Sequence, residues 1–325
     1  MTTPLKSKED RPMKKIAIAF LALAAITACQ KEEDFFQREE VPQEEEKQPQ
    51  NSELYTLSLQ ASKTIQTKAL SLDNDGATLN AHWRTGETVA VYLGSNGSLL
   101  GTLTATADGT DATKATLSGI LTTVEEVTQG SELMLLFPRA EWDYTGQDGS
   151  APDETGSLAS KYDYATATVT VASVDDVNKV ITTTSGADFE NQQSIYRFGF
   201  KINGTGNAIP VKGFTVSPTN GAFVHTRNYY GDYWGETYSP ITVNVASGTL
   251  TMPYVALRNH MANSSNTLDD TYHFSVIGAD DALYLGQKDI PNSVLKEQGK
   301  FISAKSVSVS KARVSEDYNQ TYTAW

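Results

Sequence analysis

Residues 54–61 read LYTLSLQA, and this stretch indicates the fold of the whole chain. Tyr55, Leu57, Leu59 and Ala61 fall on one face, and polar residues fall on the other. A period of two is typical of a β-strand that buries one face and exposes the opposite one. We therefore expect the folded part of the protein to begin with such a strand.

Similar short runs recur along the chain, separated by turn residues. We expect further strands at 88–93, 99–106, 114–121, 133–137, 165–171, 195–202, 213–216, 242–245, 249–255, 272–277 and 301–309. Gly, Asn, Asp and Pro gather between them, as at 94–97 and 218–221. No segment keeps a helical period, and only 124–129 and 292–298 allow a helical turn or two. The chain is predicted to be all-β, with two β-sandwich domains at 51–188 and 189–325.

Residues 1–29 have the pattern of an export signal. Lys14 and Lys15 precede an apolar run at 16–26, and ITAC closes it at Cys29. An apolar helix of this length reaches about 16 Å, whereas a bilayer core is about 30 Å thick. Cys29 is the only cysteine, so an internal disulfide is impossible. ITAC resembles the lipobox of bacterial lipoproteins, which implies lipidation (palmitate) at Cys29 and anchoring in the outer membrane at the cell surface.

An acidic segment at 30–50 follows the signal. It carries eight acids, three bases and two prolines without an apolar period, so it is predicted to be an extended tether. Its first residues, 31–34, also resemble the acidic surface-export signal of some lipoproteins; a plain solvated linker is the alternative. The net charge of −13 includes −5 in the tether and +3 in residues 1–29, which leaves −11 for 51–325. An acidic body without Lys/Arg clusters argues against nucleic acid as a partner.

Residues that carry chemistry are scattered. His82, His225, His260 and His273 have no ligand or base partner at a recognisable spacing. The turn at 73–76 (DNDG) lacks the other acids of a calcium loop, so a hairpin turn is predicted there. No phosphate loop or nucleophile elbow occurs. We expect no enzyme activity, no metal and no cofactor.

Aromatic residues cluster at 229–234 (YYGDYW). Their rings are suited to contact a sugar or a host surface, but a hairpin tip folded onto its own sandwich explains the pattern equally well. The residues in question are Tyr229, Tyr230, Tyr233 and Trp234. Together with Trp142 and Tyr144 they support an alternative function, a surface glycan-binding lipoprotein.

Three stretches resemble one family. Residues 82–92 (HWRTGETVAVY), 187–198 (ADFENQQSIYRF) and 299–311 (GKFISAKSVSVSK) are similar to conserved elements of the fimbrillin (Mfa-like) family, whose members are type V pilus subunits. The resemblance implies two transthyretin-like Greek-key β-sandwich domains in tandem and export as a lipoprotein. It also implies head-to-tail assembly with other pilus subunits by donor-strand exchange, and a role in cell adhesion.

In that family a protease removes the first strand before assembly. Here the removable strand would carry Tyr55, Leu57, Leu59 and Ala61, and cleavage by an Arg/Lys-specific protease would fall at Lys68–Ala69 or after Lys63. Lysine replaces the family's usual arginine, which leaves open whether the chain is trimmed. The donor strand is predicted to carry Val307 and Val309, or to lie in the tail at 312–325; a frayed end of the last strand is the alternative.

Overall fold

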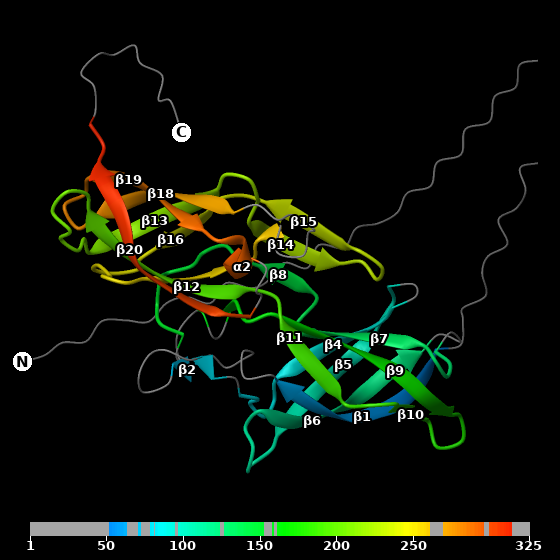
Figure 1. The fold of residues 1–325 in the computed structure, drawn as a ribbon. Helices are drawn as coiled ribbons and strands as arrows, with labels where there is room; N and C mark the ends of the chain where they lie inside the picture. The colour runs from blue at the N-terminus through cyan, green and yellow to red at the C-terminus, as the bar shows by residue number, and fades with distance from the viewer. Residues whose placement is uncertain are drawn as a thin grey trace, which may run out of the picture. The chain divides into compact units, whose positions relative to one another are not determined.

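The computed structural model describes residues 52–63, 71–72, 79–80, 82–94, 97–123, 127–152, 158, 161–260, 269–295 and 299–313. All of them lie in one unit, residues 49–325. Strands make up almost all of its regular structure (Figure 1). The all-β prediction is confirmed.

The first sheet closes on itself. Its strands are β1 (Glu53–Lys63), β4 (Thr88–Leu93), β5 (Leu99–Ala107), β6 (Lys114–Thr123), β7 (Glu132–Phe137), β9 (Ala165–Asp175), β10 (Val180–Thr183) and β11 (Ala187–Asn191). The hydrogen-bonded order runs β1-β6-β5-β4-β7-β9, and both β10 and β11 join β9 back to β1. We call this ring the first barrel. Closure leaves no open sheet edge between these strands.

The second sheet is open and has seven strands. They are β12 (Ser194–Ile202), β13 (Val211–Pro218), β16 (Ile241–Asn244), β17 (Tyr254–Leu257), β18 (Asp270–Gly278), β19 (Leu283–Ile290) and β20 (Phe301–Lys311), in the order β16-β13-β18-β19-β20-β12-β17. One helical turn, α2 (Asn292–Leu295), precedes β20. The edges of this sheet are therefore β16 and β17.

Two smaller sheets complete the regular structure of the described residues. One contains β8 (Glu141–Asp143), β14 (Val224–Tyr229) and β15 (Trp234–Tyr238), with β14 in the centre. The other pairs the two-residue strands β2 (Ser71–Leu72) and β3 (Leu79–Asn80).

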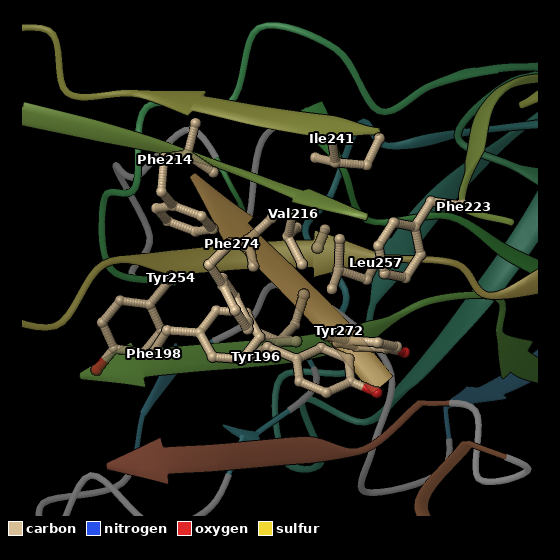
Figure 2. Packing of buried hydrophobic residues seen from close by; sticks show 14 of the residues in the cluster. Tyr196, Phe198, Phe214, Val216, Phe223, Ile241, Tyr254, Leu257, Tyr272 and Phe274 are labelled. Carbon is tan, nitrogen blue, oxygen red and sulfur yellow. The ribbon is translucent and has the colours of Figure 1, made fainter. Parts of the chain in front are cut away.

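Each large sheet packs against its own hydrophobic core. The first core lies inside the first barrel and includes Leu57, Trp83 and Phe189. Aromatic rings dominate the second core, where Phe198 meets Phe274 edge to face at 4.9 Å (Figure 2). Edge-to-face pairs add about 0.5–1.5 kcal/mol each to the stability gained from burial alone. The alternating strands supply these side chains, which explains why the period-two pattern predicted them.

Described residues between β7 and β9 pack with the second core. Trp142, Tyr144, Tyr162 and Tyr164 are buried there, and β8 pairs with β14 of the later half of the chain. The chain then returns to the first barrel as β9. The first barrel ends at β11 and the second sheet starts at β12.

The strand predictions differ from the structure in several places. The strand expected at 249–255 is wrong at its start, because only Tyr254–Leu257 is a strand and Pro253, just before it, has no N–H to donate. Strands β2, β3, β8, β10, β11, β14, β15 and β19 were not predicted from alternation. The helical turn expected at 292–298 is present over Asn292–Leu295, whereas Val127–Gln129 is not helical. The turn at 73–76 lies outside the described residues.

Candidate functional site

Strand β1 is hydrogen-bonded along both edges. On one side it runs antiparallel to β6, in register from Glu53 opposite Thr123 to Ser62 opposite Lys114. On the other side it runs parallel to β10 and then to β11. Its nearest partner in sequence, β6, is more than fifty residues away. No short hairpin therefore joins β1 to a neighbouring strand, and hydrogen bonds and side-chain packing keep it in the sheet. We call the position between β6 and β10/β11 the β1 slot.

The inward face of β1 fills the first core. Tyr55, Leu57, Leu59 and Ala61 are all buried, and the residues between them are mostly exposed. The sequence therefore placed the apolar face of this strand correctly.

Polar contacts fasten the start of β1 to the turn between β9 and β10. The Tyr55 hydroxyl donates to Asp176 Oδ1 at 2.5 Å, and Lys179 Nζ lies 2.6 Å from Glu53 Oε2. The ammonium of Lys179 also lies 4.9 Å from the centroid of the Tyr55 ring. Because the Lys179–Glu53 pair is half exposed, water and salt screen it and it contributes little stability.

Lys63 fastens the other end of β1 in a different way, since its side chain is completely buried. Its ammonium donates to the His82 carbonyl at 2.9 Å, lies 3.2 Å from Glu87 Oε2, and sits 3.4 Å from the centroid of the Trp83 ring. The Phe137 ring lies on the same ammonium at 5.0 Å. Protease cleavage after Lys63 needs access to this side chain, so in the folded protein its burial disfavours that site.

Burial lowers the pKa of Lys63 to about 8, although the neighbouring Glu87 carboxylate opposes the shift. The unfolded chain then binds more protons than the folded one between about pH 8 and pH 10.4, so stability rises with pH across this window. We expect the free energy of unfolding at pH 9.5 to exceed its value at pH 7 by about 2 kcal/mol from this group. Urea titrations at both pH values test this, and Lys63→Met should abolish the rise. An equal rise in the Lys63→Met protein would contradict the assignment.

The two valines predicted for the donor strand lie within their own sheet. Val307 and Val309 are buried in the second core, where β20 pairs with β12 on one side and β19 on the other. Donating them would require β20 to leave its own sheet. This placement disfavours β20 as the donor, while residues 314–325 of the tail lie outside the described residues.

The aromatic cluster at 229–234 divides into two pairs. Tyr229 is buried and its ring meets that of Tyr92 at 5.4 Å, and Trp234 packs on Trp142 at 4.4 Å. Tyr230 and Tyr233, at the tip of the β14–β15 hairpin, are 53% and 60% exposed and stack on each other at 5.4 Å. Trp142 and Tyr144 are core residues, so of the rings that we considered for surface recognition only Tyr230 and Tyr233 are well exposed.

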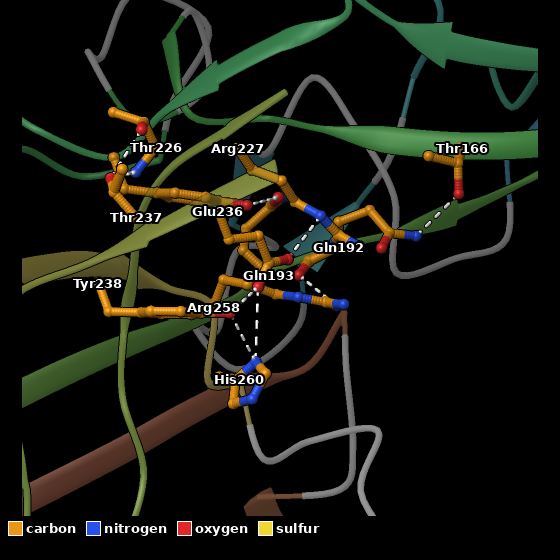
Figure 3. Close-up of polar contacts among 11 residues, drawn as sticks. Thr166, Gln192, Gln193, Thr226, Arg227, Glu236, Thr237, Tyr238, Arg258 and His260 are labelled. Carbon is orange, nitrogen blue, oxygen red and sulfur yellow. Dashed lines mark hydrogen bonds and ion pairs between the residues drawn. The ribbon is translucent and has the colours of Figure 1, made fainter. Parts of the chain in front are cut away.

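A buried arginine, Arg227, contacts two residues of β15 in this hairpin. The Arg227 guanidinium lies 3.9 Å from the centroid of Trp234. Its Nε is 2.7 Å from Glu236 Oε1 (Figure 3). Burial lowers the pKa of Arg227 to about 10, so it stays charged at neutral pH. Glu236 also accepts a hydrogen bond from Tyr238 at 2.7 Å, and His260 Nδ1 lies 3.0 Å from the same hydroxyl. These contacts explain Trp234 as a structural residue.

The two kinds of aromatic residue should respond differently to truncation. We expect Trp234→Ala to lower the free energy of unfolding by about 3 kcal/mol, because it removes the ring that covers Arg227 and Trp142. Tyr233 is the preceding residue and is exposed. Tyr233→Ala should therefore change the free energy of unfolding by less than about 0.5 kcal/mol. Urea unfolding of both variants is the measurement, and equal losses would contradict this division.

Gln147 is a structural residue that the sequence analysis missed. Its side-chain amide donates to the Ala256 carbonyl at 2.8 Å and accepts from the Ala256 N–H at 2.7 Å. Its backbone carbonyl accepts from the N–H of Asn244 at 2.9 Å. One buried glutamine thus links edge strands β16 and β17 of the second sheet. No local motif marks such a residue, because its partners lie about a hundred positions away.

The remaining predicted sites give no chemical centre in the part of the chain that the structure describes. There, no three His, Cys, Asp or Glu side chains are arranged to hold a metal ion. His260 contacts Tyr238, and His273 Nε2 lies 2.7 Å from the Thr219 hydroxyl. No helix of the described ranges is long and apolar enough to cross a membrane. Cys29, Lys68 and Ala69 lie outside those ranges.

No protein-family model matches the chain, and no curated protein matches it. The chain aligns with several solved structures at low sequence identity. A candidate cell adhesion protein from Bacteroides uniformis is 14% identical, with a TM-score of 0.40 over 79% of this chain and 96% of that one. A fimbrial protein from Bacteroides ovatus is 11% identical, with a TM-score of 0.30 over 78% of this chain and 50% of that one. The shaft pilin SpaA from Lactobacillus rhamnosus GG is 10% identical, with a TM-score of 0.30 over 81% and 99%.

Proposed function

We propose that the chain is a structural pilus subunit that assembles by exchanging its first strand for a strand of another subunit. The observation that carries this proposal is the position of β1, which fills a core and completes a ladder on both edges while being tied to the first barrel only by non-covalent contacts and one connection. The fimbrillin resemblance of residues 82–92 and 187–198 supports the same role.

Removal of β1 supplies a driving force for assembly. Tyr55, Leu57 and Leu59 would leave their core positions, and each is worth about 1.5–3 kcal/mol when fully buried. The edges of β6 and of β10/β11 would also lose their partners, and unpaired edges recruit another strand. A donated strand restores both the ladder and the core. Because donation is head to tail, repeated steps build an open fibre.

The lipid anchor, the trimming site and the donor segment are assigned to residues as follows. We assign lipid anchoring in the outer membrane to Cys29, and trimming by an Arg/Lys-specific protease to Lys68–Ala69, since Lys63 is buried. The donor is assigned to the tail at 312–325, since Val307 and Val309 belong to their own sheet. Adhesion to a host or glycan surface would use exposed side chains such as Tyr230 and Tyr233.

Mass spectrometry of the N-terminus of protein recovered from the cell surface tests the proposal. We expect polymeric material that begins at Ala69 and resists dissociation in cold detergent. A monomeric protein that still begins at lipidated Cys29 would contradict strand exchange for this chain. That result would favour an anchor subunit or the glycan-binding alternative, which then rests on Tyr230 and Tyr233 alone.

Glycan binding has a separate test. If the tip of the β14–β15 hairpin is a sugar platform, Tyr230→Ala with Tyr233→Ala should abolish retention on a glycan array that retains the unmodified chain. Loss of binding without loss of polymers would make adhesion a second function of the same subunit.

A further inference from the structure

The inward face of β1 does not end on an apolar residue. Four inward positions carry Tyr55, Leu57, Leu59 and Ala61, and the fifth carries Lys63. Its backbone N–H donates to the Thr113 carbonyl at 3.0 Å, and it lies opposite Phe189 of β11. The end of the β1 slot is therefore occupied by a cation that solvent does not reach.

The groups around this cation form a pocket of matching chemistry. Trp83 presents its ring face, Glu87 a carboxylate oxygen and His82 a backbone carbonyl, all within 3.4 Å of the ammonium. The negative charge of Asp163 also favours the cation, whereas the positive charge of Arg84 opposes it. The first three groups are acceptors or a π face, so the pocket contributes no donor to the side chain that fills it.

Such a pocket discriminates between side chains. An apolar residue would leave the His82 carbonyl and the Glu87 carboxylate without this donor, and loss of a partner from a buried acceptor destabilises a structure. An acidic residue would bring two carboxylates together in a poorly solvated place. In coiled coils, a single buried polar residue specifies the register of the paired helices at a cost in stability.

We propose that the β1 slot selects its occupant by a basic side chain, so that a strand entering from another subunit must carry Lys or Arg at the inward position next to Thr113 and Phe189. This inference rests on the proposed strand exchange and adds the chemistry of the partner. The required pattern is four apolar or small residues at alternate positions, with the basic residue as the fifth.

The tail of this chain does not have that pattern. Arg313 is the only basic residue within 312–325. The four alternate positions before it are Lys305, Val307, Val309 and Lys311, so two of them are lysines, and all four belong to β20. The matching occupant is therefore a strand of a different subunit, and the chain is suited to a mixed fibre.

Strand competition on the cut protein tests the selection. A specific cleavage sequence placed between residues 64 and 70 of the full chain allows β1 to be released after folding. The folded, cut protein is then challenged in mild urea with labelled peptides of residues 53–63 that carry Lys, Arg, Met or Glu at position 63. We expect Lys and Arg peptides to bind within about 3-fold of each other, Met about 10-fold more weakly, and Glu at least about 100-fold more weakly.

A peptide with Gln60→Met is the matched control, because Gln60 is exposed on the opposite face of β1. It should bind like the native peptide, and a peptide of residues 312–325 should bind at least about 100-fold more weakly. Equal binding of the Lys and Met peptides would overturn the selection while leaving strand exchange intact.

Failure of every peptide to enter would instead contradict strand exchange. In that case hydrogen exchange of the β1 amides, measured in the uncut chain, tests the preference for a basic residue. Exchange at least about 10-fold faster in Lys63→Met and Lys63→Glu, but not in Lys63→Arg, would support a basic-residue pocket. Unchanged exchange in all three variants would overturn it.

Discussion

Leu57→Asp is expected to unfold the first barrel. Leu57 is fully buried at the centre of β1, between β6 and β10. The substitution removes a buried leucine, which alone costs about 2–5 kcal/mol, and places a carboxylate in an apolar core where it has no partner. A loss of at least about 4 kcal/mol is expected, against a total stability of about 5–15 kcal/mol for a typical domain. Urea unfolding followed by circular dichroism measures it.

Ser58→Asp is the matched control, since Ser58 is the next residue on the same strand and faces solvent. Its free energy of unfolding should change by less than about 0.5 kcal/mol. Equal losses for the two variants would mean that β1 does not sit in the first barrel as described. The second core contains no residue of β1. In Leu57→Asp we therefore expect the second core to unfold at a higher urea concentration than the first barrel.

Gln147→Leu is expected to lower the free energy of unfolding of the second sheet by about 3 kcal/mol. The N–H and C=O of Ala256 point away from β12, and the Gln147 amide binds both of them. Leucine has a similar size but offers neither a donor nor an acceptor, so two backbone groups at a buried edge lose their partner at about 1–3 kcal/mol each. The urea midpoint of the second sheet is the measurement.

Gln287→Leu serves as its control, because Gln287 is an exposed glutamine on β19 of the same sheet. We expect no change above about 0.5 kcal/mol there. An equally small change in the free energy of unfolding of Gln147→Leu would contradict the prediction. It would mean that water replaces the amide and that the link between β16 and β17 does not contribute to stability.

The sequence predicted the strands whose two faces differ. β4 was predicted at its observed bounds because Val89, Val91 and Leu93 are buried while the residues between them are more exposed. β17 is buried on every residue, so it shows no alternation, and its start was misplaced. β19 has mostly exposed residues along its centre. In β14 the charged Arg227 is buried, whereas the polar residues beside it are partly exposed. Such strands depend on partners that a local pattern does not reveal.

The candidate site was predicted in part for the same reason. Alternation was enough to place Leu57 and Leu59 inward. It was not enough to show that Lys63 is buried, since a lysine at a strand end usually faces water. Aromatic residues pose the opposite problem, because Trp142 and Tyr233 look alike in the sequence while one is a core residue and the other is exposed. Burial of both kinds is decided by residues that meet them only in the folded chain.

The burial of Trp142, Tyr144, Tyr162 and Tyr164 in the second core limits which parts of two related chains can be exchanged. The first core draws on residues 55–137 and 165–189, and the second on residues 142–164 and 195–309, so the two are interleaved along the chain. A single crossover at residue 188 would give a chimera whose Trp142 and Tyr164 come from one parent and whose surrounding core comes from the other. Exchange of an intact second core needs three joints, near residues 139, 164 and 192. Variation between related subunits is therefore expected to accumulate by point substitution and loop change more readily than by swapping halves.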